Sequence, residues 1–265
     1  MGSSRRKSRF AAISCSHCPF QRKESVDALI NRLASGGPFG ELTDFVLLGD
    51  LFESAVASVH PDELDHTLSE EYEQAAAHLT LIRDNLPKKC KLHWLLGNHD
   101  DNLQVKDARR TDRRLRDLIH WTASPWAKVF ASWKQYPYLK PSIHDQKGCF
   151  QLGQVIFMHG FDAGQNSDEL EGLQAAYACG GHAHRLVIRG HTHRPREVTQ
   201  CRKSATVLLP FWVANAGTLG PIQPGYMHRK DVSQWGPAVV WGECKVDTPS
   251  RFASCEWSAT TEILL

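Results

Sequence analysis

The sequence lacks any long apolar segment. Within its 265 residues, no run approaches the ~20 apolar residues that a membrane-spanning helix requires, so we expect no membrane partner. Residues 1–9 are basic and rich in serine, but no apolar signal-peptide core follows them. We interpret residues 1–9 as a disordered basic tail and residues 10–265 as one domain.

Framework cysteines and a strong net charge are also missing. The eight cysteines show no spacing of the kind that staples small secreted domains. This pattern predicts a reduced, cytoplasmic protein in which most cysteines are small core residues. The formal net charge of +2 is too small to indicate a nucleic-acid partner by itself, although it does not exclude one.

The first hundred residues alternate between predicted strands and predicted helices. Short apolar runs at 10–13, 45–48 and 92–96 predict buried strands. Between them, apolar residues recur every three or four positions over 26–33 and 64–86, as they do in amphipathic helices. The order βαβαβ favours a largely parallel sheet at the start of the fold.

The later part of the chain has a different texture. Residues 101–135 are predicted to form a helical insertion that breaks at Pro125. From Tyr136 onward, short strands joined by glycine and proline turns predict a second, mixed sheet, together with a helix over 168–179. We expect these strands at 136–139, 149–152, 154–158, 186–189, 206–213, 238–241 and 252–257.

One face of the predicted insertion is basic. It carries Lys106, Arg109, Arg110, Arg113 and Arg114. Aspartates lie between these residues, as in a solvated helix with salt bridges along its surface. The alternative is a wall that attracts phosphate groups. The sequence leaves both interpretations open.

Five predicted strands end in polar clusters, at the place where α/β folds put their sites. The clusters are Cys15-Ser16-His17, Gly49-Asp50, Gly97-Asn98-His99-Asp100, His159-Gly160 and Gly190-His191-Thr192-His193. Imidazole nitrogens, carboxylate oxygens and an amide oxygen that converge from separate strands suit a pair of metal ions. We also expect His191 and His193, two positions apart, to point to one side of an extended strand end.

This ordered set of clusters resembles the motifs of the calcineurin-like metallophosphoesterase superfamily. Those motifs are Asp-x-His, Gly-Asp, Gly-Asn-His-Asp/Glu, His and Gly-His-x-His, and the resemblance spans positions 15–193 in the same order. The resemblance implies an α/β fold, namely a four-layer α/β/β/α sandwich of two mixed sheets.

The resemblance also implies a binuclear metal centre in which Asp50 bridges the two ions. The first ion would be held by Cys15, His17, Asp50 and His193. The second ion would be held by Asp50, Asn98, His159 and His191. His99 would donate a proton to the leaving oxygen or bind the phosphate, and Asp100 would keep His99 charged and oriented.

Cys15 stands where the superfamily has an aspartate. A thiolate carries the same charge as a carboxylate and is a good zinc ligand, but it is softer. We therefore predict two divalent or trivalent transition-metal ions, Zn, Fe or Mn, with Zn or Fe favoured at the Cys15 position. The alternative is a weakened first position that leaves one well-held ion.

Three further patterns have simpler interpretations. Cys15 and Cys18 form a Cys-x-x-Cys, yet Pro19 follows at once and no partner pair has zinc-clip spacing, so a redox motif or structural zinc is disfavoured. We interpret His182 and His184 as loop histidines that reach a metal only if the loop folds back. The segment 215–218 is expected to form a backbone turn near the site.

The resemblance implies a metal-dependent hydrolase of phosphate esters, acting through a hydroxide that the metal pair activates. Its substrate would be a phosphorylated small molecule or a nucleotide, and the motifs do not choose between monoesters and diesters. The alternative is a binding scaffold of the same fold with weak or no catalysis. Such a scaffold should have lost ligands broadly, whereas here Asp50, His99, His191 and His193 are all present.

Overall fold

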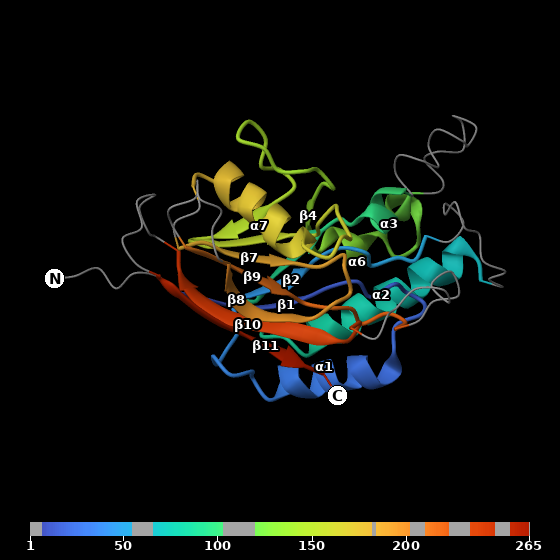
Figure 1. The fold of residues 1–265 in the computed structure, drawn as a ribbon. Helices are drawn as coiled ribbons and strands as arrows, with labels where there is room; N and C mark the ends of the chain where they lie inside the picture. The colour runs from blue at the N-terminus through green and yellow to red at the C-terminus, as the bar shows by residue number, and fades with distance from the viewer. Residues whose placement is uncertain are drawn as a thin grey trace.

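The computed structural model describes residues 7–54, 66–102, 120–181, 184–201, 210–222, 234–246 and 255–264. Two mixed β-sheets pack face to face, and helices cover the outer face of each sheet (Figure 1). The structure therefore has the four-layer α/β/β/α arrangement that the sequence predicts.

The first sheet has the strand order β11-β10-β1-β2-β3-β4. Its strands are β1 (Lys7–Ile13), β2 (Asp44–Leu47), β3 (Lys91–Leu95), β4 (Lys134–Tyr136), β10 (Ala238–Lys245) and β11 (Trp257–Ile263). The strands β1 to β4 are mutually parallel, whereas β10 and β11 run antiparallel to their neighbours. The carboxyl ends of β1, β2 and β3 therefore lie at one edge of the sheet.

The second sheet has the order β5-β6-β7-β9-β8. Its strands are β5 (Phe150–Leu152), β6 (Val155–Met158), β7 (Leu186–Arg189), β8 (Arg196–Cys201) and β9 (Phe211–Asn215). The three central strands are parallel, and the two edge strands are antiparallel to them. This sheet also presents the carboxyl ends of its central strands, β6, β7 and β9, at one edge.

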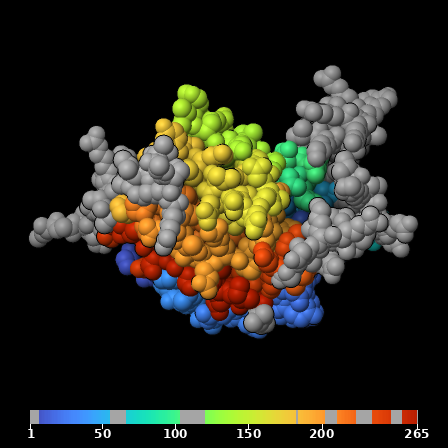
Figure 2. All heavy atoms as spheres, in the orientation of Figure 1, coloured from blue at the N-terminus to red at the C-terminus, as the bar shows by residue number. Residues whose placement is uncertain are grey.

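Helices form the outer layers. In sequence order they are α1 (Lys23–Ala34), α2 (Leu68–Asp84), the 3₁₀ helix η3 (Trp121–Ala123), α6 (Ala127–Ala131) and α7 (Ser167–Ala178). The short helix α3 (Asn98–Asp101) instead follows β3 where the strands end. Helix α2 begins at a capping box, in which the side chains and amides of Thr67 and Glu70 bond each other reciprocally. Helix α7 covers the outer face of the second sheet, where its atoms form part of the surface (Figure 2, yellow).

The alternation of side chains along the strands builds three apolar layers. In β1, Ala11 and Ile13 pack toward α1 and α2, while Phe10 and Ala12 pack toward the second sheet. A third cluster joins the outer face of the second sheet to α7. Burial on both faces explains why the central strands read as continuous apolar runs.

The structure differs from the sequence-based expectations in several places. Strand β1 begins at Lys7, so residues 7–9 belong to the sheet rather than to a tail. The last two strands, β10 and β11, join the first sheet and not the second, and β11 lies later than the predicted 252–257. Strand β8 was not predicted.

The predicted insertion over 101–135 is only partly described. Residues 120–135 form two short helices, one on each side of Pro125 as expected, and the start of β4. Residues 103–119, which carry the basic face, lie outside the described residues. Among the residues that are described, no helix has both the length and the apolar character that crossing a bilayer demands.

Candidate metal centre

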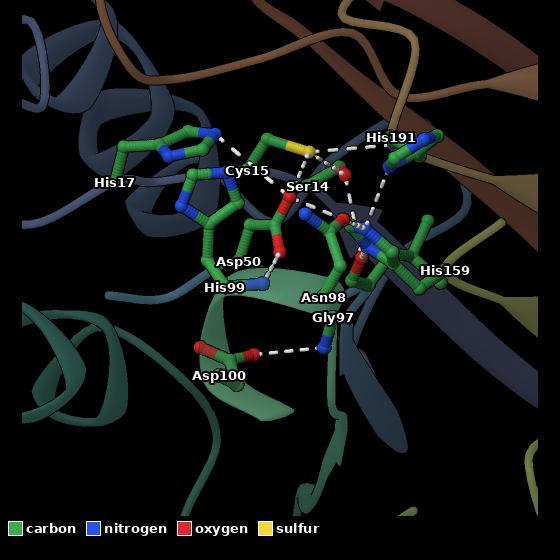
Figure 3. A network of polar contacts seen from close by, with 12 residues as sticks. Ser14, Cys15, His17, Asp50, Gly97, Asn98, His99, Asp100, His159 and His191 are labelled. Carbon is green, nitrogen blue, oxygen red and sulfur yellow. Dashed lines mark hydrogen bonds and ion pairs between the residues drawn. The ribbon is translucent and has the colours of Figure 1, made fainter. Parts of the chain in front are cut away.

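The predicted polar clusters meet where the strands of the two sheets end. Cys15 and His17 follow β1, Asp50 follows β2, and Asn98 and His99 follow β3. From the second sheet, His159 follows β6, and His191 and His193 follow β7. Figure 3 shows the side chains of Cys15, His17, Asn98, His99, His159 and His191 gathered around Asp50.

Four buried donors from both sheets make the first group: Cys15, His17, Asp50 and His193. The Nε2 atoms of His17 and His193 face each other at 3.1 Å. The Oδ2 atom of Asp50 lies 3.9 Å from His17 Nε2 and 4.0 Å from Cys15 Sγ. The Cys15 thiol thus occupies the place of a fourth donor in this group.

The second group shares Asp50 with the first and adds His159 and His191. The Nε2 atom of His159 lies 3.2 Å from Asp50 Oδ2. It also lies 3.2 Å from the amide oxygen of Asn98 and 3.2 Å from His191 Nδ1. One carboxylate oxygen is therefore central to both groups.

Backbone strain is concentrated at these residues. Seven non-glycine residues among those described have a positive φ, and five of them are Cys15, His17, Asp50, His191 and His193. Left-handed backbone costs a non-glycine residue about 1–3 kcal/mol and tends to be kept at functional sites. The expectation that His191 and His193 point to one side of an extended strand end is therefore wrong. Their φ values of 69° and 60° lie outside the extended region, and the two rings belong to different groups.

The contacts behind each ring fix which nitrogen faces inward. The carboxylate of Glu53 lies 2.7 Å from His17 Nδ1, and the main-chain carbonyl of Leu48 accepts a hydrogen bond from His159 Nδ1. Because an acceptor at Nδ1 requires the proton there, the Nε2 lone pair of each ring points into the centre. Glu53 was not among the predicted site residues.

The electrostatics of the centre follow from burial and crowded charges. Burial opposes ionisation of Asp50, but the positive charges of His159 and His99 hold its pKa well below the usual value. Burial and the charge of neighbouring histidines lower the pKa of His191 to about 3. Burial lowers the pKa of His193 well below its ordinary range, and burial raises the pKa of the Cys15 thiol.

Charged neighbours act in the opposite direction on His17. Burial disfavours its imidazolium, yet the charges of Glu53 and Asp50 raise the pKa of His17 well above the usual value. The pKa of Glu53 itself is lowered, because the charge of His17 outweighs the effect of burial.

These donors fit metal ions. Tetrahedral ligands bound at ~2.0–2.3 Å lie roughly 3.3–3.8 Å from one another, and the contacts between donors here range from 3.1 Å to 4.0 Å. The Nδ1 atom of His193 is buried and has no hydrogen-bond partner among the described residues. A thiol, imidazoles and a carboxylate match zinc and iron better than magnesium or calcium.

Asp100 does not hold the His99 ring, which corrects the sequence-based expectation. Its carboxylate accepts hydrogen bonds from the amides of Leu51, Phe52 and Gly97 and from the indole of Trp94, at 2.9–3.3 Å. Burial, followed by the charge of Asp50, raises the pKa of Asp100 to about 7. Asp100 therefore joins the loops after β2 and β3.

The His99 ring is held instead by the main chain of Glu53. The Nδ1 atom of His99 lies 2.6 Å from the Glu53 carbonyl oxygen. The His99 amide donates a hydrogen bond of 3.0 Å to Asp50 Oδ1, which places the ring beside the shared carboxylate. Figure 3 shows His99 alongside Asp50, whereas Asp100 lies apart from the His99 ring and contacts Gly97.

A buried polar network supports the histidine loops of the second sheet. Arg189, fully buried, contacts the carboxylates of Asp168 and Glu171 on α7 at 3.3 Å and 2.9 Å. The side-chain amide of Asn215 donates to Asp168, to the Gly190 carbonyl and to Thr192 Oγ1 at 2.9–3.1 Å. The predicted turn at 215–218 thus contributes side-chain contacts, and Thr218 Oγ1 also bonds the Cys15 carbonyl at 2.8 Å.

The remaining candidates lie apart from the two groups. Cys18 packs in the apolar core beneath the first sheet, so its side chain and that of Cys15 have different surroundings. His184 lies 3.5 Å from the Cys255 sulfur and belongs to neither group. His182 lies outside the described residues.

Comparison with known proteins identifies the family of the chain. A sequence model of calcineurin-like phosphoesterases matches residues 8–195, and the chain belongs to this family. No curated protein matches the sequence.

Among solved structures, a 5′-nucleotidase precursor from Thermus thermophilus is similar with a TM-score of 0.43 and 11% sequence identity. The alignment covers 98% of this chain and 55% of the nucleotidase chain, so the chain spans about half the length of that protein.

Proposed function

We propose that the chain is a metal-dependent hydrolase of phosphate esters with a binuclear centre. The observation that carries this proposal is the convergence of both donor groups on one oxygen, Asp50 Oδ2, from four separate loops of two sheets. A shared carboxylate is the feature that a pair of ions needs in order to act on one phosphoryl group.

The ligand sets are assigned by the donor groups. We propose that Cys15, His17, Asp50 and His193 hold one ion, and that Asp50, Asn98, His159 and His191 hold the other. Bound transition-metal ions would supply Lewis acidity toward a phosphoryl oxygen and would lower the pKa of water. The soft thiol of Cys15 favours Zn or Fe at the first position.

His99 is assigned the proton transfer to the leaving oxygen, or a contact with the phosphate. Its Nδ1 is engaged by the Glu53 carbonyl, which accepts but cannot donate, so Nδ1 carries a proton and Nε2 is the nitrogen left for substrate. Its amide bond to Asp50 keeps the ring next to the shared carboxylate. A fixed ring is what general acid catalysis requires.

The substrate is proposed to be a phosphorylated small molecule or a nucleotide. The metal donors act on the phosphate that these compounds share, so the centre alone does not separate monoesters from diesters. A cytoplasmic location is part of the same proposal.

The test is a reconstitution and activity screen of the full chain. Metal-free protein is loaded with Zn, Fe or Mn, its metal content is measured, and phosphomonoesters, phosphodiesters and cyclic nucleotides are offered. We expect close to two ions per chain and hydrolysis of at least one class. Absence of bound metal after reconstitution would defeat the proposal, and two bound ions without hydrolysis would favour the binding scaffold.

His99→Ala separates catalysis from metal binding. We expect turnover to fall by about 100-fold or more, the range typical of a lost general acid, with the metal content unchanged. Equal loss of metal and turnover would make His99 a ligand instead.

A further inference from the structure

Glu53 lies between two imidazoles of the centre and contacts both. Its carboxylate Oε2 is 2.7 Å from His17 Nδ1, and its main-chain oxygen is 2.6 Å from His99 Nδ1. The two rings meet edge to face, with centroids 4.8 Å apart. A single residue therefore touches one metal donor and the candidate proton donor.

Both contacts of Glu53 are made with Nδ1, whereas Nε2 is the ring nitrogen that faces the other metal donors in His17 and the substrate in His99. On His17, Nε2 is the atom directed at His193 and Asp50, so the bond to Glu53 is on the opposite nitrogen. On His99, the carbonyl contact leaves Nε2 free for substrate. Hydrogen bonds of this kind fix the tautomer and direction of an imidazole and increase its strength as a ligand.

We propose that Glu53 is a positioning residue with two separable roles. Its carboxylate orients His17 toward the metal of the first group, and its main-chain carbonyl orients His99 toward the substrate. The proposal rests on the proposed function and deepens it. It assigns the orientation of a metal ligand, His17, and of the proton donor, His99, to one residue outside the family motifs quoted above.

The main chain at Glu53 is held independently of its side chain. The Glu53 amide donates to the Cys18 carbonyl at 3.1 Å. The next residue, Ser54, has a φ of 55° and donates from its hydroxyl to the His99 carbonyl at 2.7 Å. A change of the Glu53 side chain should therefore leave the carbonyl, and with it the His99 contact, in place.

A direct metal role for Glu53 is the competing interpretation, since His17, Glu53 and His99 also form a compact donor group. In that group, however, both imidazole contacts of Glu53 have hydrogen-bond lengths and use Nδ1 atoms. The Nδ1 atoms of His17 and His99 therefore carry protons, so they have no lone pair with which to bind a metal ion beside Glu53. We therefore propose that Glu53 hydrogen-bonds to a metal ligand and does not bind metal itself.

The first experiment is calorimetric titration of the metal-free full chain with Zn²⁺, without substrate. For Glu53→Ala we expect one of two binding steps to weaken about 10–100-fold, the usual cost of losing such a partner, and the other step to stay unchanged. Glu53→Gln should give a smaller loss, because its amide oxygen still accepts from Nδ1. Glu73→Gln, an exposed carboxylate on α2, is the matched control and should bind as the parent does.

The second experiment reads the tautomers directly by ¹⁵N NMR of the histidine rings. In the parent protein, recorded at a pH high enough for His17 to be neutral, His17 and His99 should both carry a proton on Nδ1. In Glu53→Ala, His17 should become a mixture of tautomers while His99 keeps the Nδ1 proton. This split distinguishes a side-chain role from a main-chain role, and a merely structural glutamate would not produce it.

The outcomes separate this proposal from the proposed function. Two unchanged Zn²⁺ steps in Glu53→Ala, or His17 protonated on Nε2 in the parent protein, would overturn the role of Glu53 while the hydrolase stands. A third metal equivalent that disappears in Glu53→Ala would make Glu53 a ligand and overturn the role as well. A parent protein that binds no metal would defeat the proposed function, and the tautomers would still decide the role of Glu53.

Discussion

The first and second donor groups form the two halves of the candidate centre. They contain similar donors, but different residues hold those donors in place. In the first group, His17 is held by a carboxylate, and a thiol stands beside Asp50. In the second group, His159 is held by a neutral main-chain carbonyl, and the additional oxygen donor is the neutral amide of Asn98. The shared Asp50 is the one negatively charged donor of the second group.

This difference predicts different ion preferences. A cation in the first group would face the charges of Asp50, of an ionised Cys15 and, behind the His17 ring, of Glu53. A cation in the second group would face one full negative charge and neutral donors. The first half should therefore hold the softer or more highly charged ion, and the second half should exchange its ion more readily.

The strongest way to break the comparison is to remove what the halves share. Asp50→Asn leaves neither group with its central carboxylate, so we expect both ions to be lost. Loss of a residue that hydrogen-bonds to a metal ligand lowers affinity or activity about 10–100-fold. Loss of a ligand that both ions share should lower them further. Metal analysis after reconstitution and kcat/KM on an activated phosphomonoester check this, and a variant that keeps two ions would contradict it.

The next largest effect should come from removing one half at a time. His193→Ala should leave one ion, bound by the second group, and His159→Ala should leave one ion, bound by the first. Because hydrolysis is proposed to need both ions, both variants should lose most of their activity. Loss of two ions in each variant would show instead that the halves fill as one unit.

Cys15→Asp should change the metal preference rather than the metal content. Replacing the thiol by a carboxylate gives a harder donor, so activity should shift from Zn or Fe toward Mn. A near-ultraviolet thiolate-to-cobalt charge-transfer band should be present in the Co²⁺-loaded parent protein and absent from the variant. Cys255→Ser, at an exposed cysteine, is the control, and an unchanged cobalt spectrum in Cys15→Asp would show that the thiol does not coordinate.

The residues of both groups were predictable because each follows an apolar strand in a recognisable motif. The same motifs do not predict which residues hold the ligands in place. Glu53 is three residues beyond Asp50 in a stretch with no periodicity, and its role depends on a contact with a loop 36 positions away. Asp100 was given the wrong partner because adjacency to His99 in sequence places the two side chains on different sides of a short helix.

The fold shows the same limit. Strands with continuous apolar runs were found with nearly correct bounds, β7 among them. Strand β8 was missed because its edge position gives it a mixed burial pattern without a clear apolar face. The assignment of β10 and β11 to the first sheet follows from long-range pairing with β1, which no local pattern encodes.

The last contrast concerns the buried acids behind the two halves. Behind the second half, Asp168 and Glu171 face the buried Arg189. Behind the first half, Glu71 is fully buried, accepts from the Ser54 amide and faces His66 at 3.5 Å. Burial raises the pKa of Glu71 from 4.5 to about 8, so the folded protein holds this proton more tightly than the unfolded chain does.

The stability that this proton confers is complete below pH 4.5 and is lost as the pH rises toward about 8. Glu71→Gln mimics the protonated acid and keeps an oxygen for the Ser54 amide. Its free energy of unfolding should therefore match the parent's near pH 4.5 and exceed it by on the order of a few kcal/mol above pH 8. Urea denaturation of both proteins with a chelator present measures the difference. If the stability curves of the parent and Glu71→Gln ran parallel from pH 5 to pH 9, Glu71 would be ionised throughout and the first half would tolerate a buried charge. We expect parallel curves only for the parent and the control variant Glu73→Gln.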